Sequence, residues 1–362
     1  MPQSVPLIAA LPALLVMTAS ASELPAPGAA FGEASLVSVQ RIWDAAPHNA
    51  FTDLAYFKGR WFCVFREGAA HVSPDGAVRV ITSPDGTRWA SCARIAAANA
   101  DLRDPKIVET PDHRLMLTTA AAMPPPAPFN HRTLACFSRD GQQWLDPVPI
   151  GDPNLWLWRI TWHDKTAYSV GYATSGEGVV RLYASPDDRA FQVVADRLLA
   201  QGLPNESALL FLKDQTALCL LRRDAPGAAA VLGVARPPYR TWHWQDLGRS
   251  LGGPNLIALP DGRLVVAARV NSPTARTALL WLDWRAGKLT ECLTLPSGGD
   301  CSYPGLAWHD GLLWVSYYSS HEGKASIYLA KVRLSRPESG GERPPSAPPA
   351  MPPSFARPVR SH

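Results

Sequence analysis

The chain has few cysteines for its length. Its 362 residues include six, at Cys63, Cys92, Cys136, Cys219, Cys292 and Cys301, with no C-x-x-C pair. This argues against both a disulfide scaffold and a thiolate metal site, which need denser or closely paired cysteines. Cys63 and Cys219 lie at matching places in a repeat described below and are expected as buried thiols. If the protein is exported, Cys292 and Cys301 are the pair to test first for a disulfide.

The chain also lacks an excess of charge of one sign. It has 35 Lys and Arg against 31 Asp and Glu, for a net charge of +4, and no block of like charges. Binding to nucleic acid or to a membrane surface therefore has no electrostatic support. His309 and His321 have no further histidine at ligand spacing, so neither a metal nor another cofactor is predicted.

Only one apolar segment stands out, near the N-terminus. It runs from Val5 to Ala21 and ends in Ala19-Ser20-Ala21, the pattern of a cleaved secretory signal, although no Lys or Arg precedes it. We expect a signal peptide at 1–21, a leader at 22–37, and a secreted or periplasmic protein. No other segment is long and apolar enough to cross a bilayer. From Ser335 the sequence is rich in proline, which predicts a disordered tail at 335–362.

The chain does contain an internal repeat. Six segments each read as a strand, a tight turn and a second strand, at residues 51–67, 102–120, 157–173, 204–223, 253–269 and 301–318. Aligned on their turns, they recur every 47 to 55 residues. All-strand repeats of this length indicate one four-stranded blade each. We therefore predict an all-β fold, a six-bladed β-propeller of antiparallel blades spanning residues 38–334.

The repeat brings polar residues to equivalent places. One rim receives Asp53, Asp104, Arg159, Glu206, Asn255 and Tyr303, and the ends of the second strands add Arg66, Arg222 or Arg223, and Arg269. Equivalent positions of successive blades surround one channel, so these groups are expected to converge there. Converging guanidinium groups repel one another and need partners when they are desolvated. The pattern therefore favours an anionic ligand.

Two local motifs lie between the repeats. Residues 83–89 and 138–144 both have the form S-x-D-G-x-x-W, and a worn copy follows at 185–191. The Asp can accept hydrogen bonds from its own turn, and the Gly supplies a positive φ. We interpret these motifs as turns that stabilise the fold and take no part in catalysis.

These motifs resemble the Asp-box (BNR) repeats of the sialidase, or neuraminidase, superfamily. The resemblance covers residues 48 to 334 and extends to the order of the polar residues. Phe65-Arg66-Glu67-Gly68 matches the family's F-R-x-P motif, without its proline, and Glu206 precedes Arg222 by 16 residues, close to the family's spacing. The family's third Arg is matched by Arg269 or Arg276, and its late Tyr by Tyr303.

The resemblance implies a retaining exo-glycosidase that removes a terminal carboxylate-bearing sugar from a glycan or glycoconjugate. Tyr303 would be the nucleophile and Glu206 its base, with Asp104, or in reserve Asp53, as the acid/base. Three arginines would bind the sugar carboxylate, and Arg159 at the rim could contact its outer groups.

Two other functions stay open at this point. The propeller could bind acidic glycans without cleaving them, or it could be a structural or protein-binding propeller with internal salt bridges. Hydrogen bonding between Tyr303 and Glu206 would favour catalysis. Arginines that point away from one another would favour the structural role.

Overall fold

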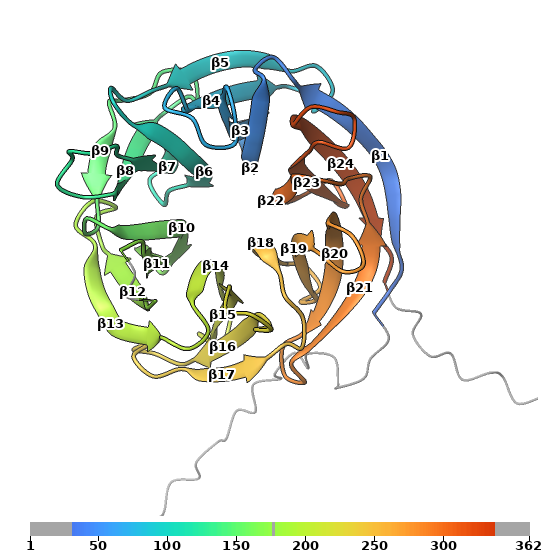
Figure 1. The fold of residues 1–362 in the computed structure, drawn as a ribbon. Coiled ribbons are helices and arrows are strands. Elements are labelled where there is room, and N and C mark those ends of the chain that lie inside the picture. The colour runs from blue at the N-terminus through green and yellow to red at the C-terminus, as the bar shows by residue number, and fades with distance from the viewer. Residues whose placement is uncertain (1–30, 176–177, 337–362) are drawn as a thin grey trace, which may run out of the picture.

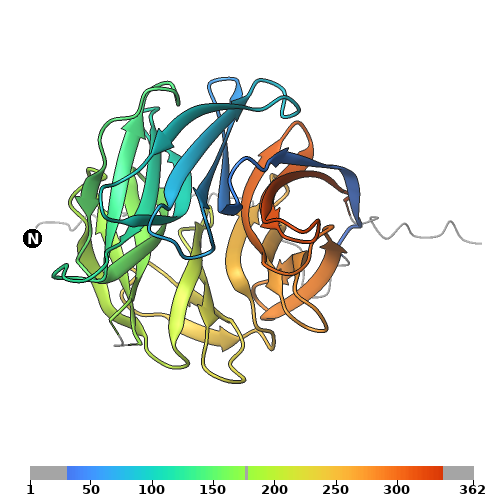
Figure 2. The same ribbon diagram turned by 45° about the horizontal axis from the view of Figure 1, so that its top comes forward.

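The protein is a closed ring of six β-sheets, as the sequence predicted. We describe it from a computed structural model, in which residues 31–175 and 178–336 are described. Every sheet has four strands, and successive strands within a sheet are antiparallel neighbours. In Figure 1 the first strand of each repeat lies nearest the centre of the ring and the last lies outermost. The turned view in Figure 2 shows the twist of the sheets.

The strands of the six blades follow one another along the chain. Blades one to three contain β2 (His48–Phe57), β3 (Arg60–Gly68), β4 (Ala77–Ser83), β5 (Ala90–Ile95), β6 (Asp101–Glu109), β7 (Leu115–Ala122), β8 (His131–Ser138), β9 (Val148–Ile150), β10 (Leu155–His163), β11 (Thr166–Ala173), β12 (Val180–Ser185) and β13 (Gln192–Leu199). Blades four to six contain β14 (Pro204–Phe211), β15 (Ala217–Arg223), β16 (Val231–Ala235), β17 (His243–Asp246), β18 (Gly252–Ala258), β19 (Leu264–Val270), β20 (Arg276–Asp283), β21 (Lys288–Thr294), β22 (Cys301–His309), β23 (Leu312–Ser319) and β24 (Ser326–Leu334).

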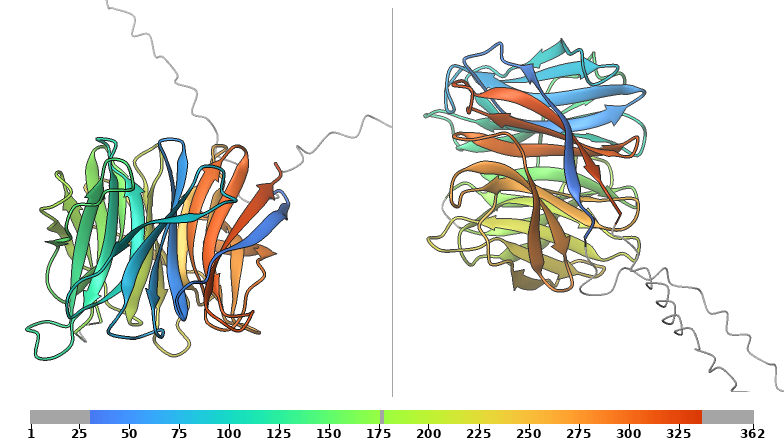
Figure 3. Two further views of the ribbon diagram at one scale, coloured as in Figure 1. Left: turned by 90° about the horizontal axis from the view of Figure 1, so that it is seen from above. Right: turned by 90° about the vertical axis from the view of Figure 1, so that its right-hand side faces the viewer.

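The outermost strand of the sixth blade comes from the other end of the chain. Strand β1 (Ala34–Trp43) pairs antiparallel with β24, with Ala34 opposite Leu334. Figure 3 shows β1, in blue, beside the red strand β24. This pairing closes the ring through main-chain hydrogen bonds. It also starts the folded domain four residues before the predicted boundary at residue 38.

Apolar side chains fill the spaces between neighbouring blades. Between the first two blades, for example, Phe62 and Val64 of β3 are packed in one cluster with Leu102 of β6 and Leu117 of β7. Strands covered on both faces are expected to be rich in Val, Ile, Leu and aromatic residues, because neither face meets water. These contacts keep the six innermost strands at fixed places around the channel.

Each innermost strand carries a β-bulge near its start. Two of its residues face a single residue of the next strand, and the pairs at fault are 51–52, 104–105, 158–159, 205–206, 253–254 and 303–304. At the first bulge position, Asp104 and Tyr303 have positive φ values of 47° and 50°. A bulge re-aims side chains, which is how a strand can turn a polar residue toward the channel. Asp104, Arg159, Glu206 and Tyr303 all lie in these bulges.

The S-x-D-G motifs form tight turns between the third and fourth strands of blades one to three. In the first, Asp85 accepts hydrogen bonds from the backbone N–H groups of Thr87 and Arg88 at 2.8 and 3.1 Å, and Gly86 has a φ of 70°. Asp140 and Asp187 accept equivalent bonds in the second and third turns. Because strands alternate in direction, these turns lie at the opposite end of the blades from the bulges. The hydrogen bonds are those expected of a turn that stabilises the fold.

Other sequence predictions meet the structure in different ways. The expected signal peptide at 1–21 lies outside the described residues, as does nearly all of the expected tail. All six cysteines are free thiols, so Cys292 and Cys301 are not bonded to each other, while Cys63 and Cys219 are fully buried as expected. Among the residues that the structure describes, no helix could span a membrane.

Candidate active site

Tyr303 lies at the centre of a compact group of polar side chains. Its hydroxyl donates a hydrogen bond of 2.6 Å to Oε1 of Glu206 and accepts one of 3.0 Å from Nη1 of Arg222. The same Arg222 nitrogen lies 2.8 Å from Oε2 of Glu206. The three side chains come from β22, β14 and β15, and therefore from two blades that are not adjacent along the chain. The structure thus brings together the phenol, carboxylate and guanidinium groups that the sequence placed on one rim.

Local backbone geometry explains how these groups meet. Glu206 and Tyr303 lie in the bulges of their strands, and Arg222 lies on β15 directly opposite the bulge that holds Glu206. The blade between them contributes Gly253, whose backbone N–H donates to Oε2 of Glu206 at 2.7 Å. Gly253 has a φ of 54°, and a Cβ there would come within 2.6 Å of the Tyr303 ring. Only glycine fits at this position without displacing the ring.

The environment keeps Tyr303 protonated until a base removes its proton. Burial raises the pKa of the phenol well above its ordinary value, and the charge of Glu206 adds to this shift while Arg222 opposes it. Tyr303 and Glu206 are only 9% and 8% exposed. A neutral phenol that donates a short hydrogen bond to a carboxylate is the arrangement of a nucleophile with its general base.

Asp104 faces the same group from the second blade. It is 5% exposed, and its Oδ1 is buried without a hydrogen-bond partner in the described part of the protein. Burial raises its pKa to about 6, against the opposing charges of Lys106 and Arg103, and the charge of Glu206 raises it further. A carboxyl group with a raised pKa and a free oxygen can give up or accept a proton near neutral pH.

Asp53, the reserve for that role, has a different environment. Its Oδ2 accepts a hydrogen bond of 2.9 Å from the backbone N–H of Ile107 and one of 2.7 Å from Arg159. It also lies one residue beyond its bulge, in register with Lys106 and not with Asp104. The turn-based alignment that equated Asp53 with Asp104 is therefore two residues out of register. Asp53 and Arg159 form an ion pair that links blades one and three.

Two cations near Tyr303 lack a carboxylate partner. The guanidinium of Arg269 lies 5.8 Å from the centre of the Tyr303 ring, makes no ion pair with any described residue, and has a buried Nε without a hydrogen bond. Lys106 is 4% exposed and donates only to the backbone carbonyls of Asp104 and Pro105, each at 3.3 Å. Burial lowers its pKa to about 8, against the opposing charge of Asp104. A desolvated cation without a partner is costly, so an anion would be stabilised here.

Three of the arginines named from the sequence do not join this group. Each is already paired with a carboxylate elsewhere: Arg66 with Asp101 at 2.7 Å, Arg223 with Asp246 at 2.6 Å and Arg276 with Glu291 at 2.9 Å. Arg66 is fully buried and also donates to Ala70 and Ser73. The strand register makes Arg66 equivalent to Arg223 and Arg269, whereas Arg222 lies one residue earlier, opposite the bulge. The expected set of three converging arginines is therefore reduced to Arg222 and Arg269.

Sequence reasoning missed several residues of the site. Gly253 was treated only as the start of a segment, although its place one blade before Tyr303 could have marked it as a close approach of backbone. Lys106 has its ammonium 4.7 Å above the ring of Trp158, and Tyr172 is fully enclosed beside Glu206 and Asp104. No motif in the sequence distinguishes these two residues from core side chains.

A separate cavity of about 390 Å³ lies at the opposite end of the blades, near the S-x-D-G turns. It is lined by Asp112, Arg114 and Phe137 among others. Arg114 is paired with Asp112 at 2.6 Å and with Asp188 at 2.7 Å. Because its main charges neutralise one another, this cavity lacks the unpartnered groups that mark the Tyr303 site.

Comparison with known proteins shows similarity of fold at low sequence identity. No protein-family model matches the chain, and no curated protein matches it. Among solved structures, a protein of unknown function from Dyadobacter fermentans superposes with a TM-score of 0.70 at 17% identity, covering 86% of this chain and 100% of that one. An α-L-arabinanase from Penicillium chrysogenum, complexed with arabinobiose, gives 0.66 at 13% identity, over 83% and 98% of the two chains.

A sialidase from Trypanosoma rangeli is also similar. It superposes with a TM-score of 0.63 at 12% identity over 85% of this chain, which spans only 60% of the length of that sialidase. At such identities the likeness establishes a shared architecture and nothing about activity. Solved propellers similar in fold to this chain thus include a sialidase and an arabinanase, two enzymes that act on sugars.

Proposed function

We propose that the protein is a retaining glycoside hydrolase that removes a terminal carboxylate-bearing sugar, in the manner of an exo-α-sialidase. The observation that carries the proposal is the 2.6 Å hydrogen bond from the Tyr303 hydroxyl to Glu206, beside Arg222 and the unpaired Arg269. The solved sialidase and arabinanase propellers support the choice of a glycosidase. The choice of an acidic sugar rests on the cations.

In the proposed first step, the Tyr303 oxygen attacks the anomeric carbon while its proton passes to Glu206. Asp104, protonated at the start, gives its proton to the leaving oxygen as the glycosidic bond breaks. A phenol suits a substrate with its own negative charge, because a carboxylate nucleophile would be repelled by it. The product of this step is a glycosyl-enzyme intermediate on Tyr303.

In the second step, Asp104 takes a proton from water, and the resulting hydroxide attacks the anomeric carbon. The bond to Tyr303 breaks, and Glu206 returns the proton to the phenolate. Two displacements at one carbon retain its configuration. Arg222 already contacts both Tyr303 and Glu206 and would stabilise the charge that moves between them.

The sugar carboxylate would lie between Arg222 and Arg269. A guanidinium presents paired donors in a plane and stays protonated, which suits carboxylate binding. Arg66 would not take part, because its donors are already satisfied in a buried ion pair with Asp101. Carboxylate binding by two arginines, with Lys106 contributing charge, is therefore expected to differ in strength from binding by three.

A panel of aryl glycosides tests this function. The purified protein should release the aryl group from an α-sialoside and not from an α-L-arabinofuranoside or a neutral hexoside, and NMR should show the α-sugar as first product. Glu206→Gln, which keeps the size of the side chain, should lose this activity. Turnover of the arabinofuranoside instead would refute the acidic substrate, and binding of an unsaturated carboxylate-bearing sugar without any turnover would show a binding propeller.

A further inference from the structure

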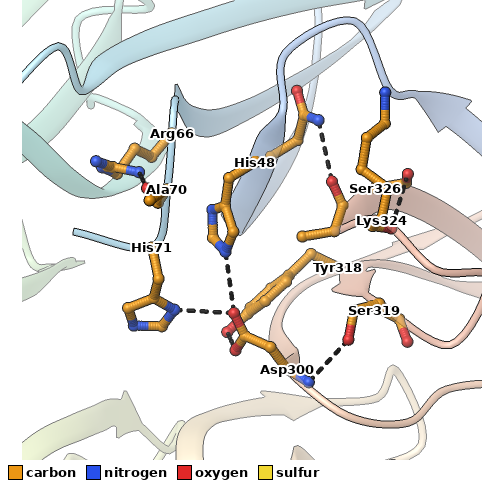
Figure 4. Close-up of polar contacts among 12 residues, drawn as sticks. His48, Arg66, Ala70, His71, Asp300, Tyr318, Ser319, Lys324 and Ser326 are labelled. Atoms are coloured by element: carbon orange, nitrogen blue, oxygen red, sulfur yellow. Dashed lines mark hydrogen bonds and ion pairs between the residues drawn. The ribbon is translucent and has the colours of Figure 1, made fainter. Parts of the chain in front are cut away.

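Two histidines and an aspartate meet near the start of the innermost strands, between the first and sixth blades. Nε2 of His48 lies 3.0 Å from Oδ2 of Asp300, and Nδ1 of His71 lies 2.8 Å from the same oxygen. Figure 4 shows both rings turned toward Asp300 from different segments. The three ligand atoms all lie within 4.8 Å of one another. None of these residues belongs to the proposed mechanism.

The fold fixes the position of each residue. His48 opens β2, His71 lies in the loop between β3 and β4, and Asp300 directly precedes β22. Asp300 is held by its backbone, whose N–H donates to the Ser320 hydroxyl at 2.9 Å and whose carbonyl accepts from the Ser320 N–H at 3.0 Å. The cluster therefore connects the first blade to the last.

We propose that His48, His71 and Asp300 bind a divalent transition-metal ion, with Zn²⁺ as the expected occupant. Two imidazole nitrogens and one carboxylate oxygen are a common set of protein ligands for zinc. Bond lengths near 2.0–2.1 Å in a tetrahedral site place neighbouring ligand atoms roughly 3.3 Å apart. The observed separations of 2.8 and 3.0 Å need only small outward shifts of the two rings to admit the ion.

The surroundings suit a bound ion in two ways. The second oxygen of Asp300 accepts a hydrogen bond of 2.6 Å from the hydroxyl of Tyr318, which would orient the carboxylate as outer-sphere partners of metal ligands do. The side chains of His48, Asp300 and His71 are 12%, 31% and 48% exposed, so one side of the cluster is open to solvent. An ion can enter from that side and keep water as its fourth ligand.

The site also lies close to Tyr303. The ring of Phe51 contacts His71 edge to face at 5.1 Å and contacts Tyr303 in the same way at 5.1 Å. A metal that fixes His71 would therefore restrict Phe51 and the ring packed on it. The metal site itself does not depend on the glycosidase proposal, because binding can be measured without a substrate.

Calorimetry with Zn²⁺ on the full-length protein, after treatment with a chelator and dialysis, tests the proposal. One equivalent should bind, and His71→Ala should weaken binding by at least about tenfold, as should Asp300→Asn. Co²⁺ should give the intense visible absorption of a four-coordinate site in the parent protein and not in these variants. Zn²⁺ should raise the melting temperature of the parent protein alone, because only its folded state gains a ligand.

His113→Ala is a matched control. His113 makes a hydrogen bond of 2.8 Å to Glu109, like that of His71 to Asp300, but has no third ligand beside it. This variant should bind Zn²⁺ like the parent. Because His71 is half-exposed, His71→Ala should fold, and its melting temperature without metal checks this. Equal Zn²⁺ binding by the parent, His71→Ala and Asp300→Asn would overturn the proposal, as would the absence of any binding to the parent.

Discussion

Replacing Tyr303 with phenylalanine removes one oxygen atom from the centre of the site. The structure predicts a modest loss of stability, because Glu206 loses one donor while its other oxygen keeps Arg222 at 2.8 Å and Gly253 at 2.7 Å. Loss of one buried hydrogen bond of this kind costs about 1–3 kcal/mol. In a domain of this size, each kcal/mol lowers the melting temperature by roughly 2–4 °C. The variant should therefore remain folded at 25 °C.

The effect on turnover should be much larger. Removal of a nucleophile that acts together with its base lowers kcat by about 10⁴- to 10⁶-fold. This corresponds to about 5–8 kcal/mol of activation free energy, which exceeds the expected loss of stability. The difference separates a chemical role of Tyr303 from a structural one. A core residue would change stability and activity in parallel through the folded fraction.

The assay is release of the aryl group from an α-sialoside, with binding of an unsaturated carboxylate-bearing sugar measured in parallel. Tyr303→Phe should bind this analogue nearly as well as the parent, because Arg222 and Arg269 are unchanged. Tyr317→Phe is the control, since its buried hydroxyl also makes one hydrogen bond, 2.9 Å to Pro296, away from the site. It should lose stability but keep activity. Turnover by Tyr303→Phe at the parent rate would remove Tyr303 from the mechanism.

Three further variants test the remaining parts of the site. Arg269→Ala should weaken binding of the same analogue by about 2–5 kcal/mol in calorimetry, and unchanged binding would show that the carboxylate lies elsewhere. Gly253→Ala should reduce both activity and melting temperature, because its Cβ would lie within 2.6 Å of the Tyr303 ring; a normal rate would contradict this geometry. Asp104→Asn should slow cleavage of substrates with poor leaving groups most, and the parent's kcat should fall as the pH rises above about 6, where the acid loses its proton. Because folding raises this pKa from 3.8 to about 6, the ionised form is the less stable one in the folded protein, so Asp104→Asn should gain up to about 3 kcal/mol of stability above pH 6 and nothing below pH 3.8 in urea unfolding.

The sequence predicted the ring of blades and much of the central group because both depend on the repeat. Strand and turn patterns recur at a fixed period, so the positions of Glu206, Arg222 and Tyr303 around one channel follow from counting. It could not predict the register within each hairpin. The bulges shift Asp53 two residues away from equivalence with Asp104, and a bulge leaves no clear trace in the turn that follows it.

The choice of partner for each charged group was also beyond the sequence. Arg66, Arg223 and Arg269 occupy equivalent strand positions, yet the first two are neutralised by Asp101 and Asp246 while the third is not. The cluster of His48, His71 and Asp300 joins segments more than 200 residues apart and has no ligand spacing to find. The sequence alone led to the prediction that no metal would bind.

Local patterns in the sequence determined how many blades form, where their turns lie and which strands line the channel, because each of these depends on neighbouring residues and on the period of the repeat. The tertiary structure decided which side chains touch: the closure of the ring by β1, the bond between Tyr303 and Glu206, and the freedom of Arg269. The physical reason is that hydrogen bonds and ion pairs between blades depend on distances of a few ångströms, which the packing of the whole ring sets.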